Sequence, residues 1–449
     1  MEAVIIADDL TGANDSGVQL ARRGLTTSVL FEMNAGAVSD QDVIVLNTDS
    51  RASSSEVAYM RVVEAARFLS QFSTKLVYKK IDSILRGNIG AELDATYDVF
   101  KPDFLVIAPA YPDNGRTTIH GVHYLDGIPV HETDIGADRI TPVTHSYIPA
   151  LLAQQTNRLT GLISLTELRS DGSLLVRRLD RLHSDGVQYV ISDAESEADL
   201  YALVEGVVQS GYRVVWVGSA GLARCLPVEL GNMNPRPRLR DGWKTEGLEH
   251  PRIKRECLAQ ESSKSVLVAV GSITERSHTQ LQVLLASQDT VGIELQPERF
   301  IGESEEREWE ICRACEMGVQ GLRNGKHVVV YVPVADSTVT HAIKAGLLHN
   351  KDRVDVSNSI AGAIGEIIAY LMHAGDWVGL VMTGGDTATQ ICNQLGIERF
   401  ELLDEVESGV PIGLLRGGKQ LPAVTKAGSF GTDAVLLHAV TMLKERSRL

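Results

Sequence analysis

Aromatic residues, cysteines and long apolar runs are all scarce in this sequence. Aromatic side chains make up only 5% of the 449 residues. No window reaches the roughly 18 uninterrupted apolar residues that a membrane-spanning helix needs. The first residues lack a basic start and include Asp8 and Asp9, so they do not have the pattern of a secretory signal. We therefore expect a cytoplasmic protein that has no membrane partner.

The cysteines are too few and too scattered to indicate a disulfide framework. They are Cys225, Cys257, Cys312, Cys315 and Cys392. An odd number of cysteines spread over a large chain favours a reducing compartment. Cys312 and Cys315 form a Cys-x-x-Cys motif inside a helix expected over 305–322. With no second pair nearby, helix packing is the favoured interpretation, and a metal or redox site is the alternative.

Several motifs of common enzyme classes are also absent. The sequence has neither a Gly-x-x-x-x-Gly-Lys-Ser/Thr loop nor a Gly-x-Gly-x-x-Gly after an expected strand, which argues against a P-loop NTPase and a standard dinucleotide fold. The formal net charge is −15, from 43 basic and 58 acidic side chains. An acidic protein repels phosphate backbones, so nucleic acid is not an expected partner, although a local basic pocket for a small anion remains compatible.

Short β-branched stretches recur along the first half, and each is followed by Gly, Ser or Asp and then by a helical pattern. Strands that are apolar throughout and alternate with helices favour a mostly parallel, doubly wound sheet with helices on both faces. Residues 115–144 have few helix signals and predict loops or an antiparallel hairpin. The expected strands of this half are 3–7, 43–47, 76–79, 104–108, 189–192 and 214–218.

The segment 231–263 interrupts this pattern with three prolines, many charges and little apolar periodicity. We interpret it as an interdomain connection. Strand–helix alternation then restarts, with expected strands at 265–270, 291–295, 327–332, 379–382 and 411–415. Because the chain is long for one hydrophobic core, the sequence predicts two α/β domains with a cleft between them. Their expected bounds are 1–235 and 263–449, joined by a linker at 236–262.

Polar clusters follow several expected strands of the first half. In an open parallel sheet, ligands bind at these carboxyl ends of the strands. Asp8 and Asp9 follow the first strand. They could bind hydroxyls or a metal or act as a base, while a helix cap is the simpler alternative. Later strand ends add cations, which suit a small carboxylate because arginine offers it two N–H groups. These cations are Arg51, Lys79, Lys80, Arg86 and Arg116.

Three turns rich in Gly, Ser and Thr each precede an expected helix in the second half. They lie at 271–274, 383–387 and 427–433. Bare N–H groups and the positive end of a helix form an anion site, and small residues let phosphate oxygens approach. We interpret these turns as a nucleotide-phosphate site. A similar stretch at 218–221, in the first half, is either another anion loop or a tight turn.

Six motifs together resemble those of the four-carbon acid sugar kinase family, over nearly the whole chain. This family combines an N-terminal sugar-acid-binding domain with a C-terminal nucleotide-binding domain. The residues that follow the shared Ala-Asp-Asp are more similar to the D-threonate kinase branch than to the 3-oxo-tetronate branch. The motifs are Ala-Asp-Asp-Leu-Thr-Gly-Ala-Asn-Asp at 7–15, Lys-Lys-Ile-Asp-Ser-Ile-Leu-Arg-Gly-Asn at 79–88, Gly-Arg-Thr-Thr at 115–118, Gly-Ser-Ala-Gly-Leu-Ala at 218–223, Thr-Gly-Gly-Asp-Thr-Ala at 383–388 and Gly-Ser-Phe-Gly at 428–431.

The resemblance implies ATP-dependent phosphorylation of the terminal hydroxyl of a four-carbon acid. D-threonate is the first candidate, and D-erythronate, 3-oxo-tetronate and 4-hydroxythreonine are alternatives. One departure is Ile84, where relatives usually carry Thr, and it could bear on substrate choice. The implied sugar-acid contacts are Asp9, Arg51, Lys79, Lys80, Ile81 and Asp82. The implied ATP contacts are Ser272, Gly384, Gly385, Asp386, Thr387, Gly428, Ser429 and Gly431.

For the mechanism, we expect Arg51, Lys79 and Lys80 to hold the carboxylate of the acid while magnesium bridges the ATP phosphates. Asp9 is the first candidate for the proton acceptor and Asp386 the second. We expect a homodimer, because dimers are the commonest soluble oligomers. Two other classes remain open: a sugar-acid aldolase or dehydrogenase that uses no ATP, and a metabolite-binding protein without turnover.

Overall fold

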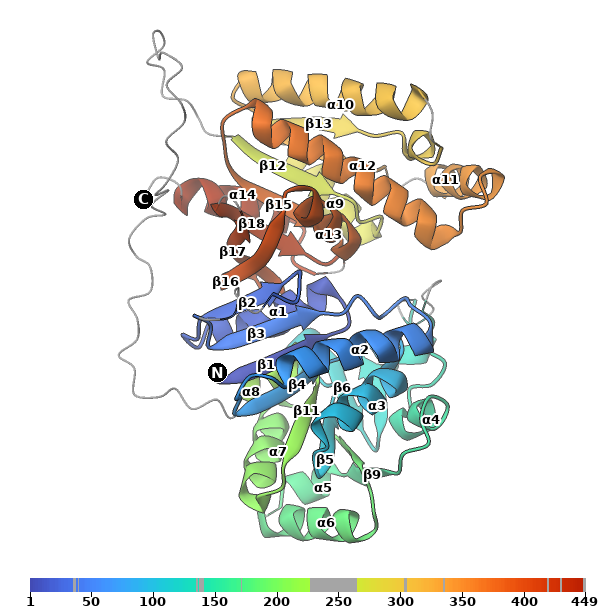
Figure 1. Cartoon of the computed structure of the whole chain (residues 1–449), viewed down its shortest axis with the longest axis vertical. Coiled ribbons are helices and arrows are strands. Elements are labelled where there is room, and N and C mark those ends of the chain that lie inside the picture. Colours follow the sequence, from blue (N-terminus) through green and yellow to red (C-terminus); the bar gives the residue numbers. More distant parts are fainter. Residues whose placement is uncertain are drawn as a thin grey trace. The chain divides into compact units, whose positions relative to one another are not determined.

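The computed structural model describes two compact units, Met1–Asn234 and Pro235–Leu449, which Figure 1 colours from blue to green and from yellow to red. The expected linker at 236–262 lies outside the described residues. The described residues are 1–34, 38, 40–134, 136, 141–170, 172–226, 265–302, 305–333, 336–417, 420–428 and 430–446.

Unit 1 is built on a parallel sheet with the strand order β2-β3-β1-β4-β11-β5-β10-β9. The strands are β1 (Ala3–Ala7), β2 (Thr27–Leu30), β3 (Val43–Asn47), β4 (Leu76–Lys80), β5 (Phe104–Ala108), β9 (Thr160–Ile163), β10 (Tyr189–Ser192) and β11 (Val214–Gly218). The helices are α1 (Leu10–Ala21), α2 (Ser55–Leu69), α3 (Ile89–Phe100), α4 (Ile148–Ala153), α5 (Leu165–Leu168), α6 (Gly172–Ser184), α7 (Glu197–Ser210) and α8 (Ala220–Cys225). The predicted doubly wound fold is confirmed in this unit.

Helices cover both faces of this sheet. Val62 and Leu69 of α2 and Ala95 of α3 pack on Val4 and Ile6 of β1 in one buried cluster, and α2 and α3 lie side by side in Figure 1. Helix α1 leads from β1 towards β2, whereas α2 leads over β1 in the other direction, from β3 to β4. Because such crossovers are right-handed, α1 and α2 leave on opposite faces. The carboxyl end of β1 is therefore a topological switch point.

A small antiparallel sheet stands apart from the parallel one. It has the order β6-β7-β8, formed by β6 (Arg116–Ile119), β7 (Val122–Leu125) and β8 (Ile128–Pro129). The hairpin turn contains His120, with a positive φ of 53°, and Gly121, with 75°. The antiparallel hairpin predicted within 115–144 is confirmed.

Unit 2 has the strand order β13-β14-β12-β15-β18-β17-β16. Its strands are β12 (Ser265–Val270), β13 (Thr290–Glu294), β14 (His327–Tyr331), β15 (Trp377–Thr383), β16 (Ile397–Glu407), β17 (Val410–Gly417) and β18 (Gln420–Lys426). Its helices are α9 (Glu275–Leu285), α10 (Glu305–Arg323), α11 (Asp336–Leu348), α12 (Arg353–Ala374), α13 (Gly385–Gln394) and α14 (Val435–Arg446). Strands β13, β14, β12, β15 and β18 pair in parallel.

Strands β16, β17 and β18 form an antiparallel meander, which the sequence analysis missed. Only 411–415 of this region was predicted to be a strand. The long β16 has irregular apolar spacing and three register shifts against β17, so the period-2 signal of a strand is weak. The turn that joins β16 to β17 contains Gly409, with a φ of 75°.

The expected helix over 305–322 is confirmed as α10. It carries Cys312, which is exposed, and Cys315, which is buried. Burial raises the pKa of the Cys315 thiol to about 11, so this side chain packs as an inert apolar group. Within the described part of the chain, no helix combines the length and the apolar character needed to cross a membrane.

Candidate functional site

The polar clusters of unit 1 come together at the carboxyl ends of neighbouring strands. Strand β1 pairs with β3 on one side and with β4 on the other, and Ala7 is in register with Asn47 and Lys80. Asp8 and Asp9 follow β1, the loop with Arg51 follows β3, and Asp82 follows β4. These residues therefore surround the switch point, where diverging connections leave room for a ligand.

Arg51 lies at the centre of this group and contacts three carboxylates. Its Nε donates to Asp8 Oδ2 at 2.7 Å and its Nη2 to Asp8 Oδ1 at 3.0 Å, so Asp8 is bound by two prongs. Nη2 also donates to Asp9 Oδ1 at 2.7 Å, and Nη1 lies 3.6 Å from Asp82 Oδ1. Most of the hydrogen-bonding capacity of this guanidinium is therefore used by carboxylates of the protein. The geometry favours Arg51 as the organiser of the acidic residues over its expected role as main ligand of a carboxylate.

Asp8 and Asp82 are held in the ionised form. Burial alone would raise the pKa of Asp8, but the Arg51 guanidinium, together with Lys80 and Lys79, outweighs burial and holds that pKa below its ordinary value. At Asp82 burial is likewise opposed by Arg86, whose Nε is 2.9 Å from Oδ2, and by Arg51, so the pKa of Asp82 is lowered. A proton acceptor works best with a pKa near the operating pH. These two carboxylates are therefore poor general bases.

Asp9 combines a structural contact with an unused oxygen. Its side chain caps α1, because Oδ1 accepts the N–H of Gly12 at 2.8 Å as well as Arg51 Nη2. The capping alternative is thus correct for Oδ1. Oδ2 accepts no hydrogen bond from the described residues, and the side chain is 23% exposed. Asp9 can therefore cap the helix and still offer one carboxylate oxygen to a ligand.

The two lysines at the end of β4 have different surroundings because successive side chains of a strand point to opposite faces. Lys79 is fully buried, with Nζ 2.6 Å from Glu92 Oε2 of α3. This ion pair favours a structural role for Lys79, in contrast to its expected ligand contact. Lys80 is 3% exposed, and its Nζ donates to Ile81 O at 2.8 Å. It forms no ion pair within the described ranges, so it keeps N–H groups for an anion.

Asp9 and Lys80 converge on Gly12. A Cβ added at this glycine would lie 2.6 Å from Asp9 Oδ1 and 2.8 Å from Lys80 Nζ. The absence of a side chain at Gly12 therefore lets a carboxylate and an ammonium approach the same point at the start of α1. This pair is the part of the site with both an acceptor and a donor left for a small polar ligand.

The other residues of unit 1 that were predicted to contact the sugar acid, Ile81, Arg86 and Arg116, lie in different environments. Ile81 and Ile84 lie in the hydrophobic core, at 1% and 2% exposed, so Ile81 reaches a ligand only through its main chain. The Ile84 side chain likewise packs in the interior. Arg86 is engaged with Asp82. Arg116 Nη1 donates to a main-chain carbonyl, while its buried Nε has no hydrogen-bond partner within the described chain.

Two side chains that the sequence analysis did not single out fix the loops of this site. Asn88 Nδ2 donates to Ser53 O at 2.7 Å and so holds the loop that carries Arg51. His123 Nε2 donates to Ser83 O at 2.9 Å. Burial lowers the pKa of His123 to about 4, so this imidazole is a neutral support at physiological pH. Asn88 stood inside a recognised motif, whereas no local pattern pointed to His123.

The glycine turns of unit 2 lie next to one another because β12, β15 and β18 are neighbours in the sheet. A Cβ added at Gly428 would lie 2.4 Å from Ser272 Oγ, and one added at Gly384 would lie 3.4 Å from Ser272 N. A Cβ at Gly271 would lie 1.8 Å from Thr387 Oγ1. Side chains at these glycines would fill a common space. Helix α9 leads from β12 towards β13 and α13 leads the other way, so this is also a switch point.

Helix α13 begins at the turn after β15. Gly384 has a φ of 94° that favours glycine, and its N–H donates to Lys426 O at 3.0 Å. Gly385 and Asp386 start the helix, with Asp386 exposed and Thr387 buried. The positive end of this helix faces the shared space. Gly431 of the third turn has a φ of 82°, and Ser429 lies outside the described residues.

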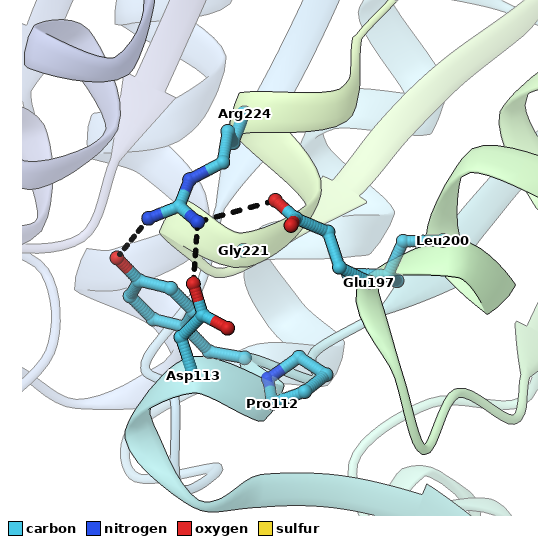
Figure 2. A pocket seen from close by; sticks show the side chains of 7 residues that line it. Pro112, Asp113, Glu197, Leu200, Gly221 and Arg224 are labelled. Carbon is cyan, nitrogen blue, oxygen red and sulfur yellow. Dashed lines mark hydrogen bonds and ion pairs between the residues drawn. The ribbon is translucent and has the colours of Figure 1, made fainter.

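The stretch 218–221 forms a tight turn, which favours the second of its two interpretations. A Cβ at Gly221 would lie 2.4 Å from Ala110 O, so glycine lets the short helix α8 pack closely on the end of β5. Figure 2 shows the adjacent pocket, where Arg224 Nη1 is 2.6 Å from Asp113 Oδ2 and 3.1 Å from Glu197 Oε1. Two carboxylates already neutralise this guanidinium. Arg224 thus links α8 to Asp113 and to Glu197 of α7.

Comparison with known proteins gives matches to both halves of the chain. A sugar-binding N-terminal domain matches residues 3–226, and a nucleotide-binding C-terminal domain matches residues 267–436. A D-threonate kinase from Salmonella typhimurium is 31% identical over 99% of this chain and 99% of its own length. A D-erythronate kinase from Heliobacterium modesticaldum is 31% identical over 98% and 96%. A 3-oxo-tetronate kinase from Pseudomonas savastanoi is 26% identical over 98% and 96%.

Solved structures have a similar fold. One, described as a putative tRNA synthase from Salmonella typhimurium, has a TM-score of 0.76 at 22% identity and covers 98% of both chains. Another, a protein from Haemophilus influenzae, has a TM-score of 0.69 at 23% identity and covers 98% of this chain and 100% of its own. At such identities these likenesses bear on the fold alone.

Proposed function

The chain belongs to the four-carbon acid sugar kinase family, and from this premise we propose that it transfers the γ-phosphoryl group of ATP to the terminal 4-hydroxyl of D-threonate. D-threonate is chosen because the residues after Ala7-Asp8-Asp9 resemble that branch and because D-threonate kinases are among the relatives at 31% identity. D-erythronate, 3-oxo-tetronate and 4-hydroxythreonine are the alternatives within the same class.

The observation that carries this proposal is the convergence of Asp9 and Lys80 on Gly12. A hydroxy acid needs a cation for its carboxylate and an acceptor for its hydroxyls. Lys80 and Arg116 have N–H groups that the described protein does not use, and Asp9 has Oδ2. Arg51 holds the carboxylates of Asp8 and Asp9 in place, so the site is organised before a ligand arrives.

In the proposed reaction, Asp9 Oδ2 accepts the proton of the terminal hydroxyl while the hydroxyl oxygen forms a bond to the γ-phosphorus. The bond between that phosphorus and ADP breaks at the same time, and the negative charge stays on ADP. Lys80 and Arg116 orient the acid through its carboxylate. The turns with Ser272, Gly384 and Gly428 provide main-chain N–H groups for the phosphates.

Magnesium fits the donors present in unit 2. Mg²⁺ in kinases is held by one or two carboxylates and by the substrate phosphates, and Asp386 is an exposed carboxylate in the first turn of α13. Ser357 Oγ lies 3.4 Å from Asp386 Oδ2 and would support it. When bound, the ion neutralises phosphate charge. We therefore assign Asp386 to the metal, which leaves Asp9 as the proton acceptor.

A panel of four-carbon acids tests the substrate assignment. ADP release is measured with ATP, magnesium and each acid, and we expect the highest kcat/KM with D-threonate. Tartrate, which has a carboxylate in place of the terminal hydroxymethyl group, is the control and should give no ADP above background. Faster turnover of another acid would reassign the substrate within the family, and no ADP with any acid would contradict the kinase assignment.

Substitution Gly12→Ala tests the proposed position of the sugar acid. The added methyl would displace Asp9 and Lys80, and misplacement of reacting groups by about 1 Å costs on the order of 100-fold in rate. We therefore expect kcat/KM for the acid to fall by about 10- to 100-fold. Because alanine is a better helix former than glycine by about 1 kcal/mol, the midpoint of urea unfolding should change little.

Gly362→Ala in α12 is the matched control. A Cβ at Gly362 would have no heavy atom within 4 Å, so this variant should gain slightly in stability and keep its activity. Equal activity of wild type and Gly12→Ala would mean that the acid binds elsewhere.

A further inference from the structure

Unit 2 contains a buried lysine that was not among the expected contacts. Lys426 is the last residue of β18 and is 3% exposed. Its Nζ donates to the main-chain carbonyls of Ala427 at 2.6 Å, Gly428 at 3.1 Å and Phe430 at 3.2 Å. No carboxylate of the described chain lies within ion-pair distance of this ammonium. A buried cation that is held only by carbonyls is costly and calls for an explanation.

Further side chains bind the carbonyls of the same turn. Gln280 is fully buried, and its Nε2 donates to the carbonyls of Phe430 at 3.0 Å, Gly431 at 3.2 Å and Thr432 at 3.0 Å. Two hydroxyls at the start of α9 also donate to Gly428 O. They belong to the N-cap residue Thr274, at 3.1 Å, and to Ser277, at 3.0 Å. Every carbonyl from 427 to 432 except that of residue 429, which is not described, thus accepts a bond from an interior side chain.

This arrangement determines which side of the turn is electropositive. In a peptide group the N–H points roughly opposite to the C=O. Carbonyls directed into the protein leave N–H groups of the turn on its other side, as in other main-chain anion sites. The N–H of Thr432 already donates to Glu407 Oε2 at 2.6 Å and that of Phe430 to Ala427 O at 3.4 Å, so the electropositive part of the turn is at Gly428. That side adjoins the turn after β12, because a Cβ at Gly428 would lie 2.4 Å from Ser272 Oγ. The ammonium of Lys426 lies behind the same peptide groups.

We propose that Lys426 is a positioning residue that holds the carbonyls of Ala427, Gly428 and Phe430 inward and adds a positive charge behind the nucleotide phosphates. Gln280 is its uncharged counterpart at the other end of the turn. The inference rests on the proposed nucleotide site in unit 2. The ligand it serves is a nucleoside di- or triphosphate.

The protonation state of Lys426 depends on burial and on the charged side chains of the elements that pack against it. Burial and, to a smaller extent, Arg276 of α9 lower the pKa of Lys426 to about 7, and Glu407 of β16 opposes this shift. Arg276 is itself 3.1 Å from Asp433 Oδ1, and Glu407 binds His438 at 2.8 Å. An added phosphate stabilises the ammonium and raises its pKa. Nucleotide binding should therefore take up a proton where the free protein is mostly neutral at this lysine, that is, above pH 7.

Calorimetry of Mg·ADP binding to the full chain tests this in buffers of different ionisation enthalpy. At about pH 8, a group whose pKa rises from near 7 to well above the working pH takes up most of one proton, and the phosphates, whose second pKa is about 6, are already ionised. We expect this uptake in the wild type. The dissociation constant should rise by up to about tenfold per pH unit above 7.

Three variants separate positioning from general structure. Lys426→Met removes the charge and the donors and should bind ADP at least about 10-fold more weakly, with no proton uptake. Lys426→Arg, which stays protonated, should restore part of the affinity without pH dependence. Gln280→Met should weaken binding but keep the proton uptake, because it removes only uncharged donors. Replacing a buried charge with methionine is tolerated in many cores, and thermal unfolding of each variant confirms its fold.

The outcomes distinguish this inference from the function on which it rests. Failure of the wild type to bind Mg·ADP would overturn both. Binding of Mg·ADP without proton uptake in the wild type, or with the same uptake and affinity in Lys426→Met, would overturn the role of Lys426 and leave the nucleotide site standing. Loss of uptake in Lys426→Met together with its retention in Gln280→Met is the result that we expect.

Discussion

The Asp9→Asn variant is expected to lose about 10²- to 10⁴-fold in kcat, the usual contribution of a general base, while it binds both ligands as the wild type does. Its amide cannot take the proton of the terminal hydroxyl. The fold should be little affected, since Asn is as good an N-cap as Asp and Arg51 keeps its two hydrogen bonds to Asp8. Its side-chain oxygen can still accept the N–H of Gly12, which lies 2.8 Å from Asp9 Oδ1. Single-turnover transfer at saturating ATP, acid and magnesium measures the effect.

Asp386→Asn is the matched comparison, because it makes the same chemical change at the second candidate. If Asp386 holds the metal, this variant needs more magnesium for half-maximal rate but recovers much of its rate at saturation. The reverse pattern would mean that Asp386 is the proton acceptor. In that case Asp9→Asn would react at the wild-type rate and Asp386→Asn would be slow even at saturating magnesium.

The Arg51→Met variant is expected to be strongly destabilising. Arg51 is the partner of Asp8, at 2.7 Å, and of Asp9, at 2.7 Å, and Asp8 is 4% exposed in its side chain. Removing one partner of a buried ion pair costs about 3–5 kcal/mol, because the other charge is left without compensation. Urea unfolding measures this loss. Arg61→Met is the control: Arg61 is 44% exposed in its side chain, so its loss should cost less than about 1 kcal/mol.

The pH dependence of the Arg51→Met effect identifies its cause. In the wild type the pKa of Asp8 is lowered, so its favourable contribution is present above the unfolded pKa of about 4 and is lost as the pH falls through the folded pKa. In the variant, burial without Arg51 raises the pKa of Asp8, and the ionised form destabilises the fold. The difference in free energy of unfolding should therefore shrink as the pH falls from about 7.5 towards about 5. A difference that is constant with pH would mean that Arg51 acts by packing.

Much of the site could be predicted because strand ends are visible in the sequence. Apolar strands that end in Asp8-Asp9 or in Gly384-Gly385 can be placed at the carboxyl edge of a sheet without knowing the sheet order. The roles of the neighbouring lysines were harder to predict. The pleat of a strand predicts that Lys79 and Lys80 point to opposite faces, but the partner of Lys79 is Glu92 on α3. That contact depends on how α3 packs, which no local pattern encodes.

Lys426 was missed for a related reason. It stands immediately before a recognised glycine turn, yet its importance depends on the antiparallel meander that places β18 beside β15. Without the order of these strands, a lysine at a strand end has no evident partner. The domain limits at 235 and 263, the cytoplasmic location and the homodimer stay predictions.

The double use of Asp9 has a consequence for the history of such proteins. If Asp9 is the proton acceptor proposed above, the same side chain also begins the first helix through Gly12. A drift to Ala or Val would therefore be selected against twice, whereas Asn, one nucleotide away in the genetic code, keeps the helix start. Duplicated genes of this lineage thus have a short route to a folded, ligand-binding pseudoenzyme, and Asn at this position would mark it.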